Sequence, residues 1–122
     1  MTYCVGLKFN RGIAFMSDTR TNAGIDSISV FRKMYTWEVP GERIFVLLSA
    51  GNLATTQSVV SLLDERSKAV AERSPSLLKT PSMFQAARMI GDTVKEVIAT
   101  SASGGQNADA FSASFIFGGQ IK

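Results

Sequence analysis

The feature that most constrains the fold is an alternation of residue types at the start of the chain. Apolar or aromatic residues occupy every odd position from 3 to 9, and small or polar residues lie between them. A period of two over this length is typical of a half-buried β-strand. Asn10-Arg11-Gly12 favours a tight turn, and Ile13–Met16 then predicts a returning strand. The chain therefore starts with a predicted β-hairpin, whose open end brings Asp18 next to Thr2.

Two further strands are expected in the next part of the chain. A polar loop is predicted over residues 19–29, followed by strands at Phe31–Val39 and Arg43–Leu48. Pro40-Gly41 supplies the turn between these strands. Ser49-Ala50-Gly51 ends the second strand with small residues, so we expect that its backbone can approach a ligand closely.

Two helices are predicted after these strands. Asn52 is a candidate N-cap for a helix that reaches about Ala71, and Thr80 is a candidate cap for a second helix with Pro81 in its first turn. Both segments repeat apolar residues at helical spacing. The predicted inward residues are Leu53, Thr56, Val59, Val60 and Leu63 in the first helix and Met83, Ala87, Ile90, Val94, Val97 and Ile98 in the second.

A last strand is predicted over residues 111–117, with a turn beginning at Gly118-Gly119. Strand runs followed by helix runs indicate an α+β domain with an antiparallel sheet. A chain of 122 residues with 45% hydrophobic content is expected to form a single domain, over residues 1–122, with its own core.

Composition excludes several function classes. The net charge is +3 and the basic residues are dispersed, whereas nucleic-acid binding favours a concentrated basic stripe. The longest apolar run, Ile44–Leu48, has five residues, far short of the roughly 20 that span a bilayer. No secretory-signal pattern is visible, and Cys4 is the single cysteine. We therefore expect a cytoplasmic protein.

The chain contains no histidine, which restricts its catalytic chemistry. No Ser-His-Asp or Cys-His pair can form within one chain, and no Cys/His zinc cluster or other cofactor site is expected. The remaining activators of a nucleophile are a lysine, a carboxylate or the α-amine of the chain. Removal of Met1 would expose Thr2, whose α-amine, with an ordinary pKa of about 7.7–8.0, can act as base for its own hydroxyl. The alternative is that Thr2 only begins a strand.

Three other residues have a functional and a structural interpretation. Lys33 lies in a largely apolar segment and needs a carboxylate partner if it is buried, for which Asp18 is the natural candidate. Such a pair either tunes a catalytic group or is a structural ion pair. Gly51 precedes a helix and can offer its N–H to an oxyanion, although glycine is common there. Cys4 is expected to be a small buried hydrophobe.

Four motifs, in this order and spacing, resemble the proteasome β-subunit superfamily, most closely its bacterial proteasome-related branch. The motifs are Thr2-Tyr3-Cys4-Val5-Gly6-Leu7, Ser17-Asp18-Thr19-Arg20-Thr21-Asn22-Ala23-Gly24, Phe31-Arg32-Lys33 and Ser49-Ala50-Gly51-Asn52-Leu53-Ala54. The resemblance covers the whole chain and implies an N-terminal nucleophile hydrolase fold, an α-β-β-α sandwich with antiparallel sheets. Chains of that family are about twice as long, so we expect only the N-terminal half here, with about five strands and two helices.

The resemblance also implies roles for individual residues. Thr2 matches the nucleophile, Asp18 and Lys33 match the residues that tune it, and Gly51 matches the oxyanion-hole glycine. In that scheme Lys33 lowers the basicity of the α-amine and Asp18 holds the lysine in place.

The remaining implications concern substrate and assembly. Thr21, Phe31 and Ser49 match positions that line the family's primary specificity pocket, where Phe31 favours apolar or small substrate side chains. The implied activity is that of a threonine endopeptidase, acting on peptides or unfolded proteins inside a self-compartmentalised homo-oligomer, either a ring or an open helix. Whether an unfoldase is a partner stays open, and neither nucleic acid nor membrane is expected. Two alternatives remain: a non-catalytic assembly subunit, if Met1 is retained or the chain is truncated, and an amidase of the same fold that acts on small amides.

Overall fold

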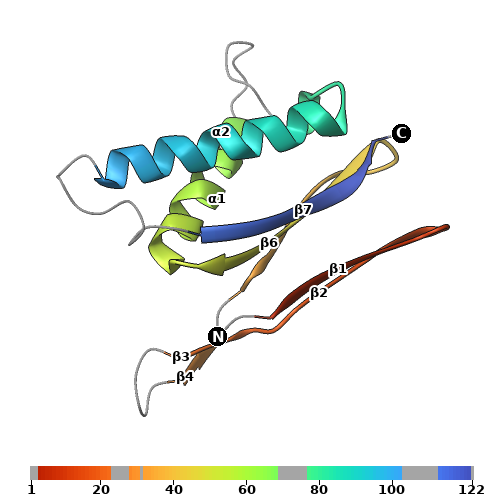
Figure 1. The fold of residues 1–122 in the computed structure, drawn as a ribbon. Helices are drawn as coiled ribbons and strands as arrows, with labels where there is room; N and C mark the ends of the chain where they lie inside the picture. The colour runs from red at the N-terminus through yellow and green to blue at the C-terminus, as the bar shows by residue number, and fades with distance from the viewer. Residues whose placement is uncertain (1–2, 23–27, 31, 69–76, 103–112, 122) are drawn as a thin grey trace.

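The computed structural model describes residues 3–22, 28–30, 32–68, 77–102 and 113–121. This part is α+β, as predicted, and is built in three layers (Figure 1). Two helices cover one side of a three-stranded sheet, and a β-hairpin lies against its other side. The helices are α1 (Leu53–Lys68) and α2 (Met83–Ala102), the sheet contains β5 (Met34–Val39), β6 (Arg43–Gly51) and β7 (Ala113–Ile121), and the hairpin consists of β1 (Cys4–Phe9) and β2 (Gly12–Ser17).

Strand β6 is the centre of the three-stranded sheet and is buried on both faces. It pairs antiparallel with β5 and with β7, in the order β5-β6-β7. Phe45 and Leu47 are fully buried and belong to the core cluster formed with the helices. Val46 and Leu48 alternate with them and are also buried, on the side of the hairpin. The apolar run in this strand is explained by its central position, because the side chains from Phe45 to Ser49 are covered on both faces of the sheet.

The helices pack on the sheet through the predicted apolar residues. Asn52 caps α1 as predicted, because its Oδ1 accepts a hydrogen bond of 2.9 Å from the N–H of Thr55. Val59 and Leu63 are buried against the sheet, and the indole N–H of Trp37 donates to Asp64 Oδ1 at 2.8 Å. The first helix is described as far as Lys68, so its predicted extension to Ala71 lies outside the described residues.

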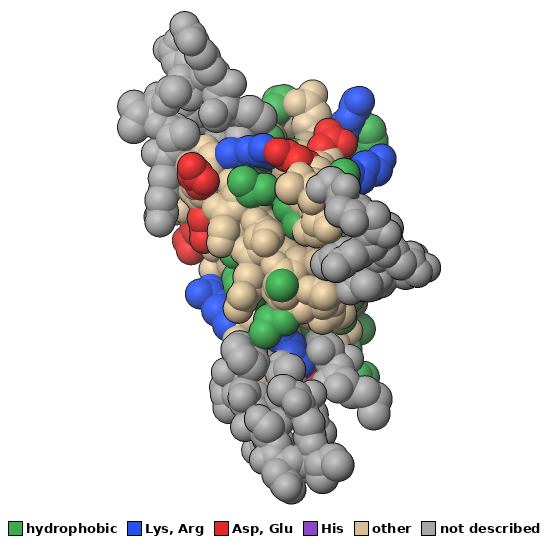
Figure 2. Space-filling model, turned by 90° about the vertical axis from the view of Figure 1, so that its left-hand side faces the viewer, with side chains coloured by type: hydrophobic (Ala, Val, Ile, Leu, Met, Phe, Trp, Pro, Cys, Tyr) green, Lys and Arg blue, Asp and Glu red, His purple; other side chains and the backbone are tan. Residues whose placement is uncertain are grey.

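The helical layer carries many charged side chains on its surface. Acidic and basic side chains lie side by side in the upper part of Figure 2. Arg66 of α1 pairs with Glu96 of α2 at 3.0 Å. No helix in the described part of the chain is both long and apolar enough to span a bilayer.

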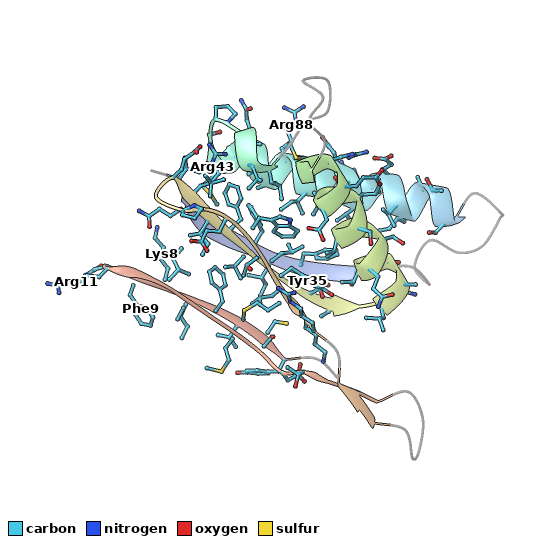
Figure 3. The ribbon with its side chains drawn as sticks, turned by 180° about the vertical axis from the view of Figure 1, so that it is seen from behind. Lys8, Phe9, Arg11, Tyr35, Arg43 and Arg88 are labelled. Atoms are coloured by element: carbon cyan, nitrogen blue, oxygen red, sulfur yellow. The ribbon has the colours of Figure 1, made fainter. Side chains whose placement is uncertain are left out.

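The predicted start of the second helix is wrong by two residues. Helix α2 begins at Met83, and its N-cap is Ser82, whose Oγ accepts from the N–H of Gln85 at 3.3 Å. The hydroxyl of Thr80 is engaged elsewhere, because it bonds to Leu77 O and to the guanidinium of Arg43. The buried Arg43 side chain also donates to Thr80 O at 2.6 Å, near the short 3₁₀ helix η1 (Leu77–Lys79) (Figure 3).

The inward face of α2 is otherwise close to the prediction. Ile90 and Val97 are buried as expected, but Ala86 is fully buried and its neighbour Ala87 is exposed. Ala86 lies four residues before Ile90 and therefore on the same helix face, whereas Ala87 points about 100° away from Ala86.

The first hairpin forms as predicted, with Val5 opposite Met16 and Leu7 opposite Ala14. Its two faces differ, and Figure 3 shows Lys8 and Phe9 on opposite sides of the ribbon. The inner face packs on the larger sheet. The outer face exposes large apolar side chains, which are 51–69% exposed: Tyr3, Leu7, Phe9 and Met16.

The predicted polar loop at 19–29 contains two short strands. Strand β3 (Arg20–Asn22) pairs antiparallel with β4 (Ile28–Val30), so the described residues form seven strands rather than about five. Three residues are too few for a recognisable alternation, which is why the sequence pattern missed them. The next strand, predicted from Phe31, begins at Met34.

The predicted turn at Gly118-Gly119 is also wrong, because β7 continues through both glycines to Ile121. Both residues are needed for close packing. A Cβ at Gly118 would lie 2.6 Å from Cζ of Phe15, a side chain of the hairpin. Gly119 has a φ of +155°, and a Cβ there would collide with the carbonyl oxygen of Ile44 on the paired strand. The two glycines therefore let the layers and strands approach each other.

Gly118→Ala should destabilise the protein by about 1–3 kcal/mol, because the added methyl group pushes the Phe15 ring out of its place between the layers. Gly91→Ala is the matched control. Gly91 lies on the exposed side of α2 with nothing within 4 Å of an added Cβ, so this change should stabilise by about 0.5–1 kcal/mol. Urea unfolding of both variants measures the difference. Equal effects of the two changes would show that the hairpin does not pack closely at Gly118.

Candidate active site

The site is built at the open end of the first hairpin. Asp18 follows β2 directly, and its N–H donates to Tyr3 O at 3.0 Å. In return the N–H of Tyr3 donates to Asp18 Oδ1 at 3.3 Å. Asp18 is therefore fixed beside the backbone of Tyr3. Thr2 precedes Tyr3 in the chain but lies outside the described residues, so its contact with Asp18 stays a prediction.

Lys33 joins this end of the hairpin to the larger sheet. Its Nζ lies 2.7 Å from Asp18 Oδ1, and the residue is only 6% exposed. The carbonyl oxygen of Lys33 accepts from the N–H of Ser49 at 3.0 Å, which fixes the lysine backbone to β6. A buried ammonium group is costly unless it is paired, so the predicted Asp18–Lys33 contact forms for a clear physical reason.

The electrostatic state of Asp18 follows from these contacts. The hydrogen bond from Lys33 is the largest cause and lowers the pKa of the Asp18 carboxyl; desolvation opposes it, and the N–H of Tyr3 adds a further lowering, so the net pKa is lowered. Asp18 is consequently a carboxylate at neutral pH, and the site holds a negative and a positive group in contact next to the start of β1.

Gly51 is the last residue of β6 and has a φ of +105°, a conformation that favours glycine. The chain turns at this point from the strand into the cap of α1 at Asn52. The position at a strand end agrees with the sequence analysis. The role of its N–H as an oxyanion donor stays a prediction.

The three predicted pocket residues are not assembled by the described part of the structure. Ser49 is 5% exposed and pairs with Phe115 of β7. Thr21 lies in β3 opposite Ser29, and Phe31 lies outside the described residues. The specificity pocket therefore stays a prediction.

Cys4 makes a contact that the sequence did not indicate. Its Sγ–H donates to Ser49 O at 3.5 Å, across the two layers. Burial, and secondly the negative charge of Asp18, raise the pKa of the Cys4 thiol, so it stays protonated at neutral pH. This agrees with the expectation that Cys4 is not a nucleophile, although it is partly rather than fully buried. The one sequence signal for the contact was that Cys4 shares a strand face with Thr2.

No family model and no curated protein matches the chain. Several solved structures match it. Anbu (ancestral beta-subunit) from Yersinia bercovieri is 46% identical with a TM-score of 0.87, and the match covers 100% of this chain and 48% of that one. An Anbu (Gly-1) mutant from Hyphomicrobium sp. strain MC1 is 48% identical, with a TM-score of 0.83 and coverages of 100% and 47%. Anbu from Pseudomonas aeruginosa, solved as a helical assembly of the Anbu complex, is 43% identical, with a TM-score of 0.83 and coverages of 99% and 48%.

The chain is a homologue of Anbu. High identity along the whole chain, together with a shared fold, confirms the resemblance to the proteasome β-subunit superfamily and the predicted fold class. The chain spans about half the length of the Anbu proteins it matches.

Asp18→Asn should lower the free energy of unfolding at pH 7, and the difference from wild type should shrink as the pH falls. The pKa of Asp18 is lowered in the folded state, so its ion pair stabilises above an ordinary carboxyl pKa of about 3.9 and is lost as the pH drops through the lowered value. Urea unfolding between pH 7 and pH 2 checks this. Asp92→Asn, on the exposed side of α2, controls for the loss of one carboxylate. A difference that stays constant down to pH 2 would contradict the stabilising ion pair.

Proposed function

We propose that this chain supplies the nucleophile-bearing part of a threonine-type endopeptidase. The observation that supports this most is the buried Lys33 ammonium group, held by Asp18 beside the backbone of Tyr3, one residue from Thr2. A positive charge at this place favours the neutral form of a nearby α-amine and the deprotonated form of a nearby hydroxyl.

In the proposed reaction the α-amine of Thr2 acts as base for its own hydroxyl, directly or through a water molecule. The Thr2 oxygen attacks the peptide carbonyl, and the N–H of Gly51 stabilises the tetrahedral oxyanion. The C–N bond then breaks, and the leaving amine takes the proton from the α-ammonium group. Water hydrolyses the acyl-threonine ester, which releases the acid product and restores Thr2.

The assembly and the substrate class are part of the same proposal. A neighbour from Pseudomonas aeruginosa forms a helical assembly, and we propose that this chain likewise functions in a homo-oligomer. The substrates would be peptides or unfolded proteins that reach an enclosed, cytoplasmic site. Thr21, Phe31 and Ser49 would line the specificity pocket, with apolar or small substrate side chains preferred. The relatives are about twice as long, so the tests below use the complete open reading frame that encodes residues 1–122.

The first test asks whether Thr2 is the N-terminal nucleophile. Intact mass should show the loss of one methionine, because a retained Met1 would block the α-amine that serves as base. An epoxyketone inhibitor, which reacts with both the hydroxyl and the amine of an N-terminal threonine, should then add one inhibitor mass per chain. Peptide mapping should place it on Thr2, and Thr2→Ala should abolish labelling.

The same experiment distinguishes the second candidate function, a non-catalytic assembly subunit. Met1 precedes Thr2 in the sequence, and its retention would leave a subunit that assembles without a usable nucleophile. A full-length mass with no labelling supports that candidate. Labelling that persists in Thr2→Ala would overturn the assignment of Thr2.

Lys33→Met should reduce peptide turnover about 100-fold while the far-ultraviolet circular dichroism spectrum is retained, because methionine fills the same space without the charge. The control is Lys95→Met on the exposed side of α2, which should leave turnover unchanged. Normal turnover in a folded Lys33→Met variant would show that Asp18 and Lys33 are only a structural pair.

A further inference from the structure

The proposed nucleophile and the proposed oxyanion donor belong to different sheets. Thr2 precedes β1, which pairs with β2, whereas Gly51 ends β6, which pairs with β5 and β7. Among the described strands no backbone ladder joins β1 to β6. Acyl transfer requires the attacking oxygen and the oxyanion donor at a fixed separation, and a displacement of about 1 Å can reduce the rate about 100-fold. Some other contact therefore has to set this distance.

Two contacts join the sheets at this end of the described structure. One runs from Asp18 through the side chain of Lys33, whose carbonyl oxygen accepts from Ser49. That path contains a long, flexible aliphatic chain. The other is the hydrogen bond of 3.5 Å from Cys4 Sγ to Ser49 O, through a side chain with a single carbon–carbon rotor. The second path contains fewer rotatable bonds than the first, although the charged Asp18–Lys33 contact is the stronger hydrogen bond.

The Cys4–Ser49 bond lies close in the sequence to both proposed reacting groups. Cys4 is the second residue after Thr2, and Ser49 is the second residue before Gly51. With about 3.3 Å per residue, Ser49 lies roughly 7 Å along β6 from Gly51. The backbone of Ser49 is also held by its N–H, which donates to Lys33 O. A change at Cys4 is therefore transmitted to β1, while β6 stays in place.

The surroundings allow β1 to move when the bond is lost. A pocket of about 180 Å³ adjoins the bond and is lined by Cys4, Leu48, Ser49, Ala50 and Ser114–Ile116. Cys4 is the residue of β1 among those that line this pocket, so at this end its side chain bridges the space to β6. The thiol keeps its proton at neutral pH, so it remains a donor to the Ser49 carbonyl.

We propose that Cys4 is a positioning residue, and that its hydrogen bond to Ser49 sets the distance between the hydroxyl of Thr2 and the N–H of Gly51. The inference rests on the proposed function, because it takes Thr2 as the nucleophile. It adds a residue that does not touch the substrate and acts through the placement of the first strand. Loss of the Cys4–Ser49 hydrogen bond should slow the formation of the covalent bond to Thr2 and should leave substrate binding unchanged.

The experiment measures the epoxyketone reaction in two parts, the reversible binding constant and the first-order rate of bond formation. Cys4→Ala should lower the rate of bond formation about 10- to 100-fold with the binding constant little changed. Cys4→Ser should restore most of the rate, because a hydroxyl also donates to the carbonyl. Val5→Ala is the matched control. It shortens the neighbouring side chain on the opposite face of the same strand and should leave the rate of bond formation unchanged.

Each outcome bears on the proposal. A wild-type rate in Cys4→Ala, or a rate in Cys4→Ser as low as in Cys4→Ala, overturns the positioning role while the proposed function stands. A wild-type protein that is not labelled at Thr2 overturns the proposed function and the positioning role with it. If Cys4→Ala does not fold, Cys4→Val takes its place, because the valine side chain extends into the adjoining pocket and has no hydrogen-bond donor. Cys4→Val should lower the rate of bond formation as expected for Cys4→Ala.

Discussion

Burial of the Lys33 ammonium group imposes a contact on the rest of the structure. A charge at 6% exposure needs an anion nearby, and Asp18 provides it at 2.7 Å. Asp18 belongs to the end of the hairpin and also accepts from the N–H of Tyr3. Lys33 is fixed to β6 through the N–H of Ser49. The hairpin, the segment before β5 and the central strand therefore have to meet at one point, which is the candidate active site.

Close contact between the layers depends on small residues as much as on large ones. Phe15 of the hairpin lies over Gly118, where an added Cβ would come within 2.6 Å of the ring. Cys4 reaches the backbone of Ser49 from the same face of the hairpin. These contacts keep β1 near β6 without a shared ladder of backbone hydrogen bonds. The consequence for function is that side chains, and not sheet hydrogen bonds, set the geometry between the start of β1 and the end of β6.

Local features were predicted well where the sequence contains a local physical signal. The alternation from 3 to 9 and the turn residues after it predicted the hairpin, and Asn52 was correctly assigned as the cap of α1. The Asp18–Lys33 pair was predicted from the cost of an unpaired buried charge. The exceptions have local explanations. Strands β3 and β4 are too short to show a period, and Ser82 replaces Thr80 as the cap because the Thr80 hydroxyl bonds to Leu77 and Arg43.

By itself the sequence determined the types of the main elements and the chemistry open to the chain. Periodicity and capping are properties of neighbouring residues, and the absence of histidine leaves a lysine, a carboxylate or the α-amine of the chain as the candidate activators of a nucleophile. Only the tertiary structure decided which residues meet between the layers. Gly118 is indistinguishable from a turn glycine until Phe15 is placed over it. The partner of Cys4 lies 45 positions away, and such a contact depends on the path of the folded chain, about which local periodicity contains no information.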